Sequence, residues 1–401
     1  MRSTTSDNAR DRIRRPPARD RSEPASRTRS PTNEPEAAGV VVCYANGEDG
    51  NPRSHESVTR RLAASKLAVL KGYGFGGEYE SGSSYAGGIY FVPSRTLVGG
   101  AELGIRDADD LFGGVVPYAF VGTKTITHPV VDERAQVPED WSHEFAATVK
   151  HAVLDGYAAF SPEDAMRGGG KLLQRGGVRV KPALALGGRG QVVAADYAEL
   201  RAAVEDIDAG EFRQCGVTLE QNLTSVTTYS VGQVRVADLV ATYYGTQLLT
   251  NDNRGLEVYG GSDLTIVRGG FDALLALDMP EGVRGAVEHA QVYDAAAHAC
   301  YAGFFASRRN YDIVEGLDAD NALRCGVLEQ SWRIGGASGA EIAALECFRG
   351  EPQRTLVRAR CIELYGEHVT APPGATLYFR GEDDEVGFIT KYTVVDAHAD
   401  A

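Results

Sequence analysis

Short apolar runs rich in β-branched residues alternate along this chain with stretches whose apolar residues recur at helical spacing. The run 40–44 predicts a buried strand, and apolar side chains on one face of 56–70 predict a helix. Two further runs, 88–93 and 115–121, predict buried strands. A strand followed by a helix is how an α/β lobe begins, and we place this first lobe at 39–130.

The alternation continues beyond residue 130 and predicts a fold of the α+β or α/β class. Ser161, Pro162 and the two acidic residues after them predict a helix start, because serine caps helices and proline fits their first turn. Further strands are expected at 177–182, 216–220, 230–242, 262–267, 311–314 and 326–329. Further helices are expected at 141–154, 197–204, 286–306 and 338–348. We place the remaining domain segments at 131–225, 226–350 and 351–401.

Two glycine-rich segments match parts of nucleotide-binding motifs but lack their context. The segment Gly72–Gly77 fits GxGxxG, yet it follows a predicted helix, whereas a dinucleotide-binding loop lies between a strand and a helix. We therefore expect a plain loop there. The segment Gly168–Lys171 is followed by Leu172 instead of the Ser or Thr of a P-loop, which disfavours P-loop phosphoryl transfer.

Composition narrows the class of protein. The 401 residues are 43% hydrophobic and 24% charged, an ordinary globular balance. Lys and Arg number 41 against 55 Asp and Glu, whereas binders of polyanions carry a basic excess, so nucleic acid is not an expected partner. No apolar stretch approaches the roughly 18 to 20 residues that cross a bilayer. Six cysteines without a CxxC pair, and no secretory signal, indicate reduced thiols in the cytoplasm.

Residues 1–38 differ from the rest of the chain. They contain nine arginines and six acidic residues among Ser, Thr and Pro, with few large apolar side chains. Such a segment cannot bury enough surface to offset the entropy of ordering it. We expect a flexible tail, or a start codon assigned too early, because a targeting peptide would be poor in acids.

The first candidate for chemistry is a lysine followed by a glycine-rich loop. Lys181 ends a predicted strand, and Gly187, Gly188, Arg189 and Gly190 follow it. Backbone N–H groups of such a loop can close over an anionic ligand, and the lysine can pair with a phosphate. A plain hairpin turn has the same composition, so this loop alone does not decide between the two.

A second candidate lies where the next strand ends. Glu220 is followed by Gln221, Asn222 and Leu223, where backbone groups can meet an adenine edge and a carboxylate can take ribose hydroxyls. An ordinary strand end has the same pattern.

A third candidate is a pair of carboxylates on two late strands. A hairpin joining these strands would bring Asp312 and Glu329 to one face, where paired carboxylates suit an oxygen-liganded cation such as Mg²⁺. Ser331 and Arg333 follow Glu329 at spacings that share its face on an extended strand. The turn after Asp312 is long, so Glu315 or Asp318 remains an alternative partner for Glu329. A solvated hairpin tip is the competing interpretation.

In this order the three candidates resemble the ATP-grasp superfamily over about residues 120–345. The sequence is similar to the biotin carboxylase and carbamoyl-phosphate synthetase branch, in which a late Glu-x-Asn-x-Arg motif binds magnesium and phosphate. Residues 329–333 (EQSWR) stand in that place, with Ser331 where Asn is expected. The whole chain resembles an uncharacterised bacterial family of ATP-grasp-like proteins. The resemblance implies an N-terminal α/β lobe, a small flap lobe and a large metal-binding lobe.

The resemblance also implies roles for individual residues. Lys181 would hold the α and β phosphates, and Lys124 would be a second phosphate lysine. The flap would include Gly188 and Gly190. Glu220 and Leu223 would frame ribose and adenine. Asp312 and Glu329 would hold Mg²⁺, with Mn²⁺ as an alternative.

These observations lead to one expected function and one rival. We expect an ATP-dependent ligase that joins a small carboxylate to an amine or thiol through an acylphosphate, with Lys181 and Arg333 acting on the phosphates. The rival is a degenerate member that binds nucleotide for regulation or assembly, which Ser331 favours. A homodimer is left open. Arg268, Arg308 and Arg309 are candidate carboxylate clamps, but we expect them to be solvated surface arginines.

Overall fold

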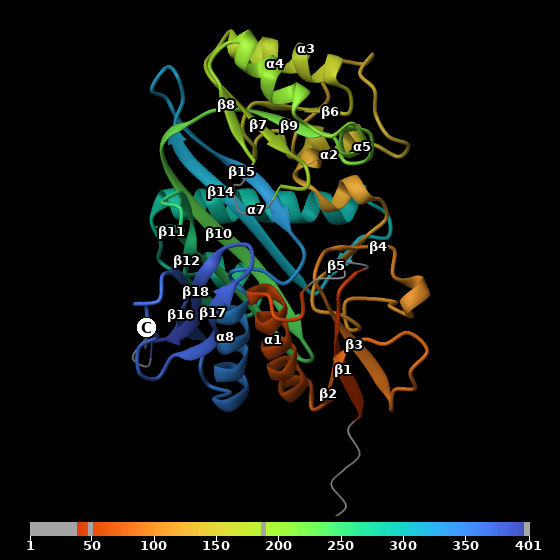
Figure 1. Ribbon diagram of the computed structural model, residues 1–401, viewed down its shortest axis with the longest axis vertical. Helices are drawn as coiled ribbons and strands as arrows, with labels where there is room; N and C mark the ends of the chain where they lie inside the picture. The colour runs from red at the N-terminus through yellow and green to blue at the C-terminus, as the bar shows by residue number, and fades with distance from the viewer. Residues whose placement is uncertain (1–37, 47–50, 186–189, 397–401) are drawn as a thin grey trace, which may run out of the picture. The chain divides into compact units, whose positions relative to one another are not determined.

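The computed structural model describes residues 38–46, 51–185 and 190–396. Helices and four β-sheets make up this part of the chain, which confirms the predicted mixed α+β class (Figure 1). The described residues all belong to one compact unit. The predicted tail 1–38 lies outside the described residues except for its last position, and the segment boundaries after 130, 225 and 350 stay predictions. No helix within the described ranges is long and apolar enough to span a membrane.

The N-terminal sheet is parallel and is built around its first strand. β1 (Gly39–Tyr44) lies between β2 (Gly74–Glu78) and β3 (Gly88–Pro93), and α1 (His55–Lys71) connects β1 to β2. The Ser54 side chain caps the start of α1, and Gly72, at φ 67°, ends it. The loop predicted for 72–77 is therefore wrong: Gly72 caps the helix, Tyr73 links it to the next strand, and the residues from Gly74 onward form β2.

A second small sheet carries the segment that leads toward the candidate site. β5 (Gly114–Val116) lies between β4 (Leu97–Val98) and β13 (Phe305–Ala306). The strand predicted at 115–121 is shorter than expected, because Pro117 lacks the N–H that continues a ladder. Three short 3₁₀ helices belong to this region: η1 (Ala101–Leu103), η2 (Ala119–Gly122) and η3 (Lys124–Thr127).

The third sheet is antiparallel and is covered by helices on one side. Its strands, in order across the sheet, are β6 (Gly156–Ala159), β9 (Val217–Gln221), β7 (Val178–Pro182) and β8 (Val192–Ala194). Its neighbouring helices are α3 (Pro162–Leu173), α4 (Tyr197–Glu205) and α5 (Ala209–Gln214), whereas α2 (His143–Thr148) packs against α7 (Glu281–Cys300). The helix predicted at 141–154 is thus confined to α2. The glycines before Lys171 lie inside α3, where a Cβ on Gly169 would come within 2.6 Å of Leu200 on α4, so they serve helix packing.

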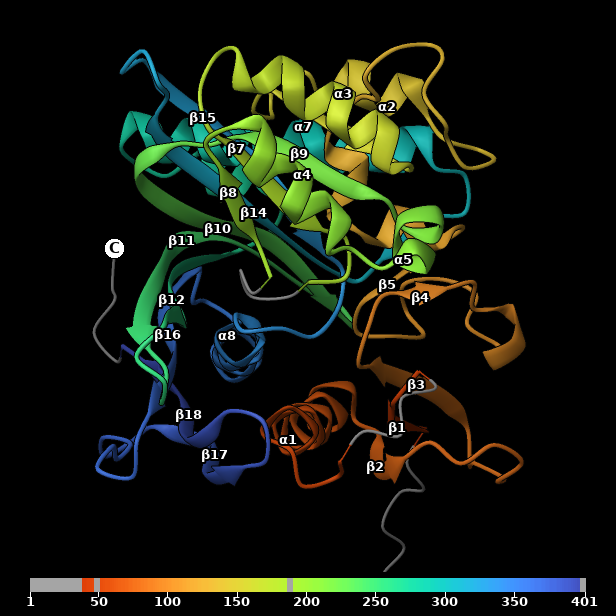
Figure 2. The same cartoon turned by 45° about the horizontal axis from the view of Figure 1, so that its top comes forward.

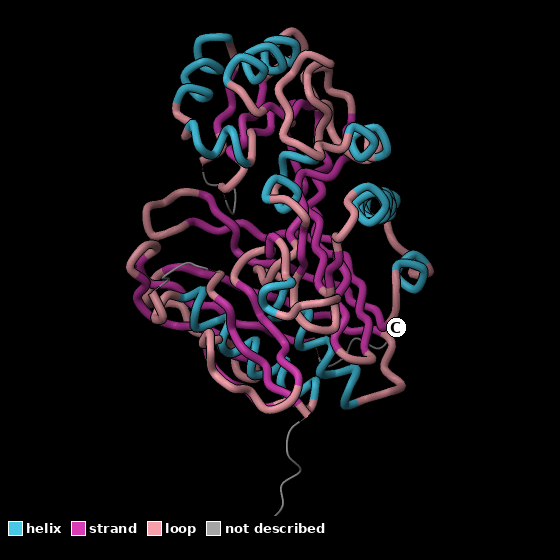
Figure 3. The backbone as a smooth tube through the Cα atoms, turned by 90° about the vertical axis from the view of Figure 1, so that its right-hand side faces the viewer, coloured by secondary structure: helices cyan, strands magenta, loops and turns pink. Residues whose placement is uncertain are grey.

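The large sheet has eight strands, and its strands run side by side in Figure 3. In order they are β15 (Leu323–Ser331), β14 (Arg308–Leu317), β10 (Thr224–Val236), β11 (Leu239–Asn251), β12 (Glu257–Arg268), β16 (Leu356–Tyr365), β18 (Gly387–Val395) and β17 (Thr376–Asp383). The single strand predicted at 230–242 is really two, since the turn at Ala237, with φ 53°, separates β10 from β11. The C-terminal strands join this sheet through the pairing of β16 with β12.

The two faces of the large sheet have different cover. α7 (Glu281–Cys300) packs on the face that carries Tyr229, Val231 and Tyr311, together with the short α6 (Phe271–Leu275). α8 (Ser338–Gly350) packs on the opposite face, against Tyr243 and other core residues. Figure 2 shows α8 between α1 and this sheet. Because side chains alternate along a strand, Asp312, next to Tyr311, points to the face that α8 covers.

Candidate functional site

The third sheet holds a buried ion pair between two of the predicted residues. The Lys181 ammonium lies 2.5 Å from Glu220 Oε1, and both side chains are almost fully buried. Burial by itself would raise the pKa of the Glu220 carboxyl, but the charge of Lys181 and a hydrogen bond from His128 lower it below its usual value. Glu220 is therefore a buried anion with Lys181 as its counterion.

His128 is the second partner of Glu220, and the sequence patterns gave no sign of it. Its Nε2 lies 3.0 Å from Glu220 Oε2, and its ring is fully buried. Gly156 pairs directly with Glu220 across β6 and β9. A Cβ on Gly156 would come within 2.7 Å of three ring atoms of His128, so the ring occupies the space that this glycine leaves.

Lys124 joins the short helix η3 to the large sheet. Its ammonium lies 2.7 Å from Glu329 Oε2 and donates to the carbonyl of Ala185 at 2.7 Å. The side chain of Gln330, next to Glu329, donates to the carbonyls of Thr123 and Val121 and so holds the backbone beside Lys124 against β15. Lys124 thus contacts both Glu329, a predicted cation ligand on β15, and the backbone at Ala185, two residues before the predicted flap.

Asp312 and Glu329 are brought together as the hairpin pattern predicts. They lie directly opposite each other on β14 and β15. Burial and the neighbouring Glu329 charge raise the pKa of Asp312 to about 7. Burial acts on Glu329 in the same direction, but Lys124, Lys181 and Arg333 outweigh it and lower the pKa of Glu329.

The two alternative partners for Glu329 are excluded by their positions. Glu315 lies opposite Cys325 and accepts a long hydrogen bond from Tyr229, which faces α7. Asp318 lies at the hairpin tip and pairs with Arg324 at 2.7 Å. Asp312 is therefore the carboxylate that shares a face with Glu329.

Arg333 lies beyond the end of β15 and close to the carboxylates. Glu329 and Glu56 both favour its charged form, while burial and the neighbouring Arg308 lower its pKa. Within the described ranges its guanidinium has a hydrogen bond to the Ile334 carbonyl and no carboxylate within ion-pair distance. A half-buried guanidinium in that state can accept an anionic ligand.

The three arginines expected on the surface are held by protein groups: Arg308 is fully buried, and Arg268 and Arg309 are half-buried. Arg308 is fully buried, pairs with Glu341 on α8 at 2.8 Å and donates to the Ser331 hydroxyl at 3.3 Å. Arg309 pairs with Asp294 on α7. Arg268 donates to the carbonyl of Phe348 in the last turn of α8 and to the carbonyl of Arg354 beyond it. The surface expectation is wrong because buried carboxylates and helix-terminal carbonyls attract guanidinium groups. Ser331 is thereby engaged by Arg308.

The predicted adenine residues have backbone and packing roles in the structure. The N–H of Gln221 donates to the Asp155 carbonyl, and the N–H of Asn222 donates to the Gly177 carbonyl. Leu223 is buried with Leu154 and Val314, where the third sheet meets the large sheet. Of the predicted flap, Gly190 is exposed with φ 70°, whereas Gly187, Gly188 and Arg189 lie outside the described residues.

The acidic pair offers a partial cation site. No group of three or more His, Cys, Asp or Glu side chains gathers as metal ligands within 38–46, 51–185 and 190–396. Asp312 Oδ1 is nevertheless buried and has no hydrogen-bond partner. An orphaned carboxylate oxygen opposite a second carboxylate fits a hard cation that completes its shell with phosphate oxygens and water.

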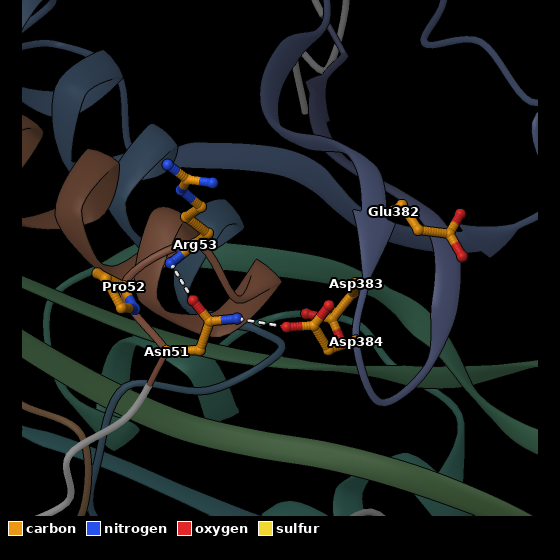
Figure 4. A pocket seen from close by; sticks show the side chains of 6 residues that line it. All are labelled: Asn51, Pro52, Arg53, Glu382, Asp383 and Asp384. Carbon is orange, nitrogen blue, oxygen red and sulfur yellow. Dashed lines mark hydrogen bonds between the residues drawn. The ribbon is translucent and has the colours of Figure 1, made fainter.

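A separate hollow of about 490 Å³ lies between the segment before α1 and the β17–β18 turn (Figure 4). The Asn51 side chain spans it by donating to the Asp384 carboxylate at 2.7 Å. Its lining residues are Asn51, Pro52, Arg53, Glu382, Asp383 and Asp384. Three carboxylates repel phosphates, and no predicted site residue lines this hollow, so we assign no nucleotide to it.

Comparison of the sequence with protein-family models finds one matching family. A family model described as "Protein of unknown function (DUF3182)" matches residues 42–393. No curated protein matches the sequence.

Three solved structures illustrate what the chain is similar to. A carboxyaminoimidazole ribonucleotide synthase from Aspergillus clavatus, complexed with ATP, has 12% identity and a TM-score of 0.48, covering 90% of this chain and 94% of that one. The biotin carboxylase of Campylobacter jejuni has 12% identity and a TM-score of 0.47, covering 89% and 87%. The D-alanyl-alanine synthetase A of Vibrio cholerae has 11% identity and a TM-score of 0.45, covering 74% and 89%.

Proposed function

This chain belongs to the family described as "Protein of unknown function (DUF3182)", and we propose that it is an ATP- and Mg²⁺-dependent ligase of the ATP-grasp type. Such a ligase joins a small carboxylate to an amine or thiol through an acylphosphate. The proposal rests on the residues of the site and on the resemblance of its motifs to that superfamily.

One observation carries the proposal: cationic groups from different parts of the fold, and a second carboxylate from the neighbouring strand, gather around Glu329. Glu329 lies 2.7 Å from Lys124, and Asp312 lies opposite it on the neighbouring strand. Lys181 and Arg333 are close enough to lower the pKa of Glu329 as well. Three cationic groups around a carboxylate pair suit a polyphosphate chain carrying a divalent cation.

Asp312 and Glu329 are the residues that would hold Mg²⁺, or Mn²⁺ in its place. When bound, such a cation neutralises developing negative charge on phosphate oxygens. The unpartnered Asp312 Oδ1 supports this assignment, since a buried carboxylate oxygen without a donor is costly unless something else compensates it. The Ser331 hydroxyl, used by Arg308, would add little.

The chain's own residues would position the reactants and neutralise their charge. Lys181 and Lys124 would pair with phosphate oxygens, and Arg333 would orient the transferring phosphoryl group or the substrate carboxylate. A carboxylate oxygen of the substrate would attack the γ-phosphorus, and the bond to the β–γ bridging oxygen would break to release ADP. An amine or thiol would then attack the acyl carbon, lose its proton and displace inorganic phosphate.

The acceptor substrate would lie beside Arg333, on the face of the large sheet that α8 covers. Tyr259 lies on this face, and burial and the charges of Glu363 and Asp312 raise the pKa of its phenol. Lys391, paired with Glu363 at 2.9 Å, lies farther along the same face. Groups of both charges fit a small polar substrate that carries a carboxylate, and we propose a cytoplasmic small-molecule reaction without nucleic acid or membrane.

A second function is favoured by one observation, the engagement of Ser331 by Arg308. If the cation needs Ser331 as a third oxygen ligand, the loss of that ligand would leave a protein that binds nucleotide for regulation or assembly and has no ATP turnover. The two functions differ in turnover and agree in nucleotide binding.

The test is ATP consumption by the purified full chain with Mg²⁺, alone and with pooled carboxylates and amines, with Lys181→Ala as the inactive comparison. Release of ADP and phosphate that requires a substrate pool supports the ligase. Release of AMP contradicts the acylphosphate route, because adenylation leaves AMP. Binding of ATP without turnover in any pool supports the second function, and absence of ATP binding overturns both.

A further inference from the structure

We propose that His128 is a positioning residue for the nucleotide phosphates, which keeps Glu220 hydrogen-bonded so that Lys181 is free to turn from Glu220 to a phosphate. This inference rests on the proposed nucleotide binding. It concerns a residue that neither the sequence motifs nor the superfamily resemblance assigns.

The arrangement divides the two oxygens of Glu220 between two donors. Lys181 lies 2.5 Å from Oε1, and His128 Nε2 lies 3.0 Å from Oε2. All three side chains are at most 3% exposed. Water therefore cannot stand in for either donor, and each oxygen depends on its own partner.

The hydrogen-bond pattern places a hydrogen on Nε2 of His128. Glu220 is an anion and can only accept, so Nε2 must carry the hydrogen that is donated. The other ring nitrogen, Nδ1, is buried without a partner. The donated hydrogen bond of this ring is therefore the one to Glu220.

The position of the ring is imposed by its surroundings. Gly156 lies opposite Glu220 in the β6–β9 ladder, and the ring of His128 fills the space where a Cβ would be. His128 follows directly after η3, the helix that carries Lys124. The same short segment thus supplies a cation to Glu329 and a hydrogen-bond donor to Glu220.

The role of His128 follows from two competing demands on the Lys181 ammonium. In the structure Lys181 is the counterion of a buried carboxylate, yet phosphate binding requires the same ammonium. Turning Lys181 away would strand Glu220 if it had no other donor, and an unpaired buried charge is strongly destabilising. The N–H of His128 leaves one oxygen hydrogen-bonded at all times and lowers the cost of that exchange.

The test compares ADP binding, measured by titration calorimetry, in the wild-type chain and in His128→Phe, which keeps a ring and removes the donor. We expect His128→Phe to bind ADP about tenfold more weakly, the worth of one hydrogen bond to a charged group. His128→Gln, whose amide can place an N–H near the Nε2 position, should recover most of the affinity. His289→Phe is the matched control, since His289 also has an unpartnered buried Nδ1 but no carboxylate partner.

The second measurement separates positioning from a merely structural role. In a Lys181→Met background, adding His128→Phe should cause no further loss of ADP affinity, because His128 acts through that lysine. The inference would be contradicted if His128→Phe weakened ADP binding as much in the Lys181→Met background as in the wild-type chain. If His128→Phe fails to fold, Gly156→Ala replaces it, because the added methyl group displaces the His128 ring and should weaken ADP binding. The control is Gly285→Ala, where the added methyl group meets open space.

The outcomes separate the inference from the function on which it rests. If the wild-type chain binds ADP and His128→Phe binds it equally well, the inference is overturned and the proposed function stands. If the wild-type chain binds no ADP, the proposed function fails and the inference falls with it. Tenfold weakening that Gln restores, and that vanishes without Lys181, supports the inference.

Discussion

The ammonium of Lys124 lies 2.7 Å from Oε2 of Glu329, so a lysine from a 3₁₀ helix neutralises a carboxylate at the end of β15. Lys124 is buried, whereas the Glu329 side chain remains 27% exposed. Glu329 can therefore meet a ligand on its open side while Lys124 holds it in place. This pair and the Lys181–Glu220 pair supply the charges on which the proposed function depends.

Glu329→Gln should reduce Mg²⁺-dependent ATP turnover by at least about 100-fold, because a neutral amide removes one of two carboxylates for the cation. ATP binding should survive in part, since the lysines remain. Turnover and ATP affinity are measured on the same preparation. Glu315→Gln on β14 is the control and should keep wild-type turnover. Unchanged turnover in Glu329→Gln would remove this residue from the metal assignment.

Stability should depend on pH through Asp312. Its pKa is raised from 3.8 to about 7 in the folded chain, so the folded state holds a proton that the unfolded chain has lost. The free energy of unfolding should therefore fall as pH rises from about 4 to about 7. Asp312→Asn should remove this fall and be more stable than wild type near pH 8, by on the order of 4 kcal/mol.

Denaturant unfolding of both proteins across this pH range measures the effect. Wild type and Asp312→Asn should converge near pH 4, where Asp312 is protonated in the folded state. Mg²⁺ should stabilise wild type more near pH 8 than near pH 5. At each pH, Mg²⁺ should stabilise Asp312→Asn less than it stabilises wild type. A variant that follows the wild-type pH curve would show that Asp312 does not titrate in this window.

Glu341→Gln should destabilise the fold without acting on the proposed chemistry directly. Glu341 and Arg308 are both fully buried and pair at 2.8 Å, so the change leaves a buried guanidinium without its counterion. The expected loss is about 3–5 kcal/mol in the free energy of unfolding. The exposed pair Arg349–Asp238 provides a control: Asp238→Asn should cost less than about 1 kcal/mol. Equal losses in the two variants would contradict the burial argument.

Lys181→Met and the double variant Lys181→Met/Glu220→Gln should differ in stability. The single change leaves the buried Glu220 with His128 alone, and we expect a loss of about 3 kcal/mol. Replacing Glu220 by Gln as well removes the unpaired charge and should recover much of that loss. Both variants should lack ATP turnover. A double variant that is less stable than the single one would mean that Glu220 is held mainly by His128.

Much of the local structure follows from the sequence because its causes are local. The strand at 40–44, the helix after Ser54 and the helix after Ser161 arise from apolar periodicity and from capping side chains a few residues away. The facing of Asp312 and Glu329 is local as well, since a hairpin brings its two strands together without reference to the rest of the chain. The errors lie where two elements divide an apolar run, as at Ala237, or where a glycine segment forms a strand, as after Gly72.

The sequence by itself determined the mixed fold class, a late hairpin with acidic residues on both strands and the order of the lysine and glutamate candidates, but it left the partner of Glu329 open. Only the tertiary structure decided which charges meet: Lys124 with Glu329, Lys181 and His128 with Glu220, and Arg308 with Glu341. Periodicity reports which face of an element is buried, but it carries no information about which distant element covers that face. Charged side chains that pair across sheets, and a histidine that fills the space beside a glycine, are settled by that packing alone.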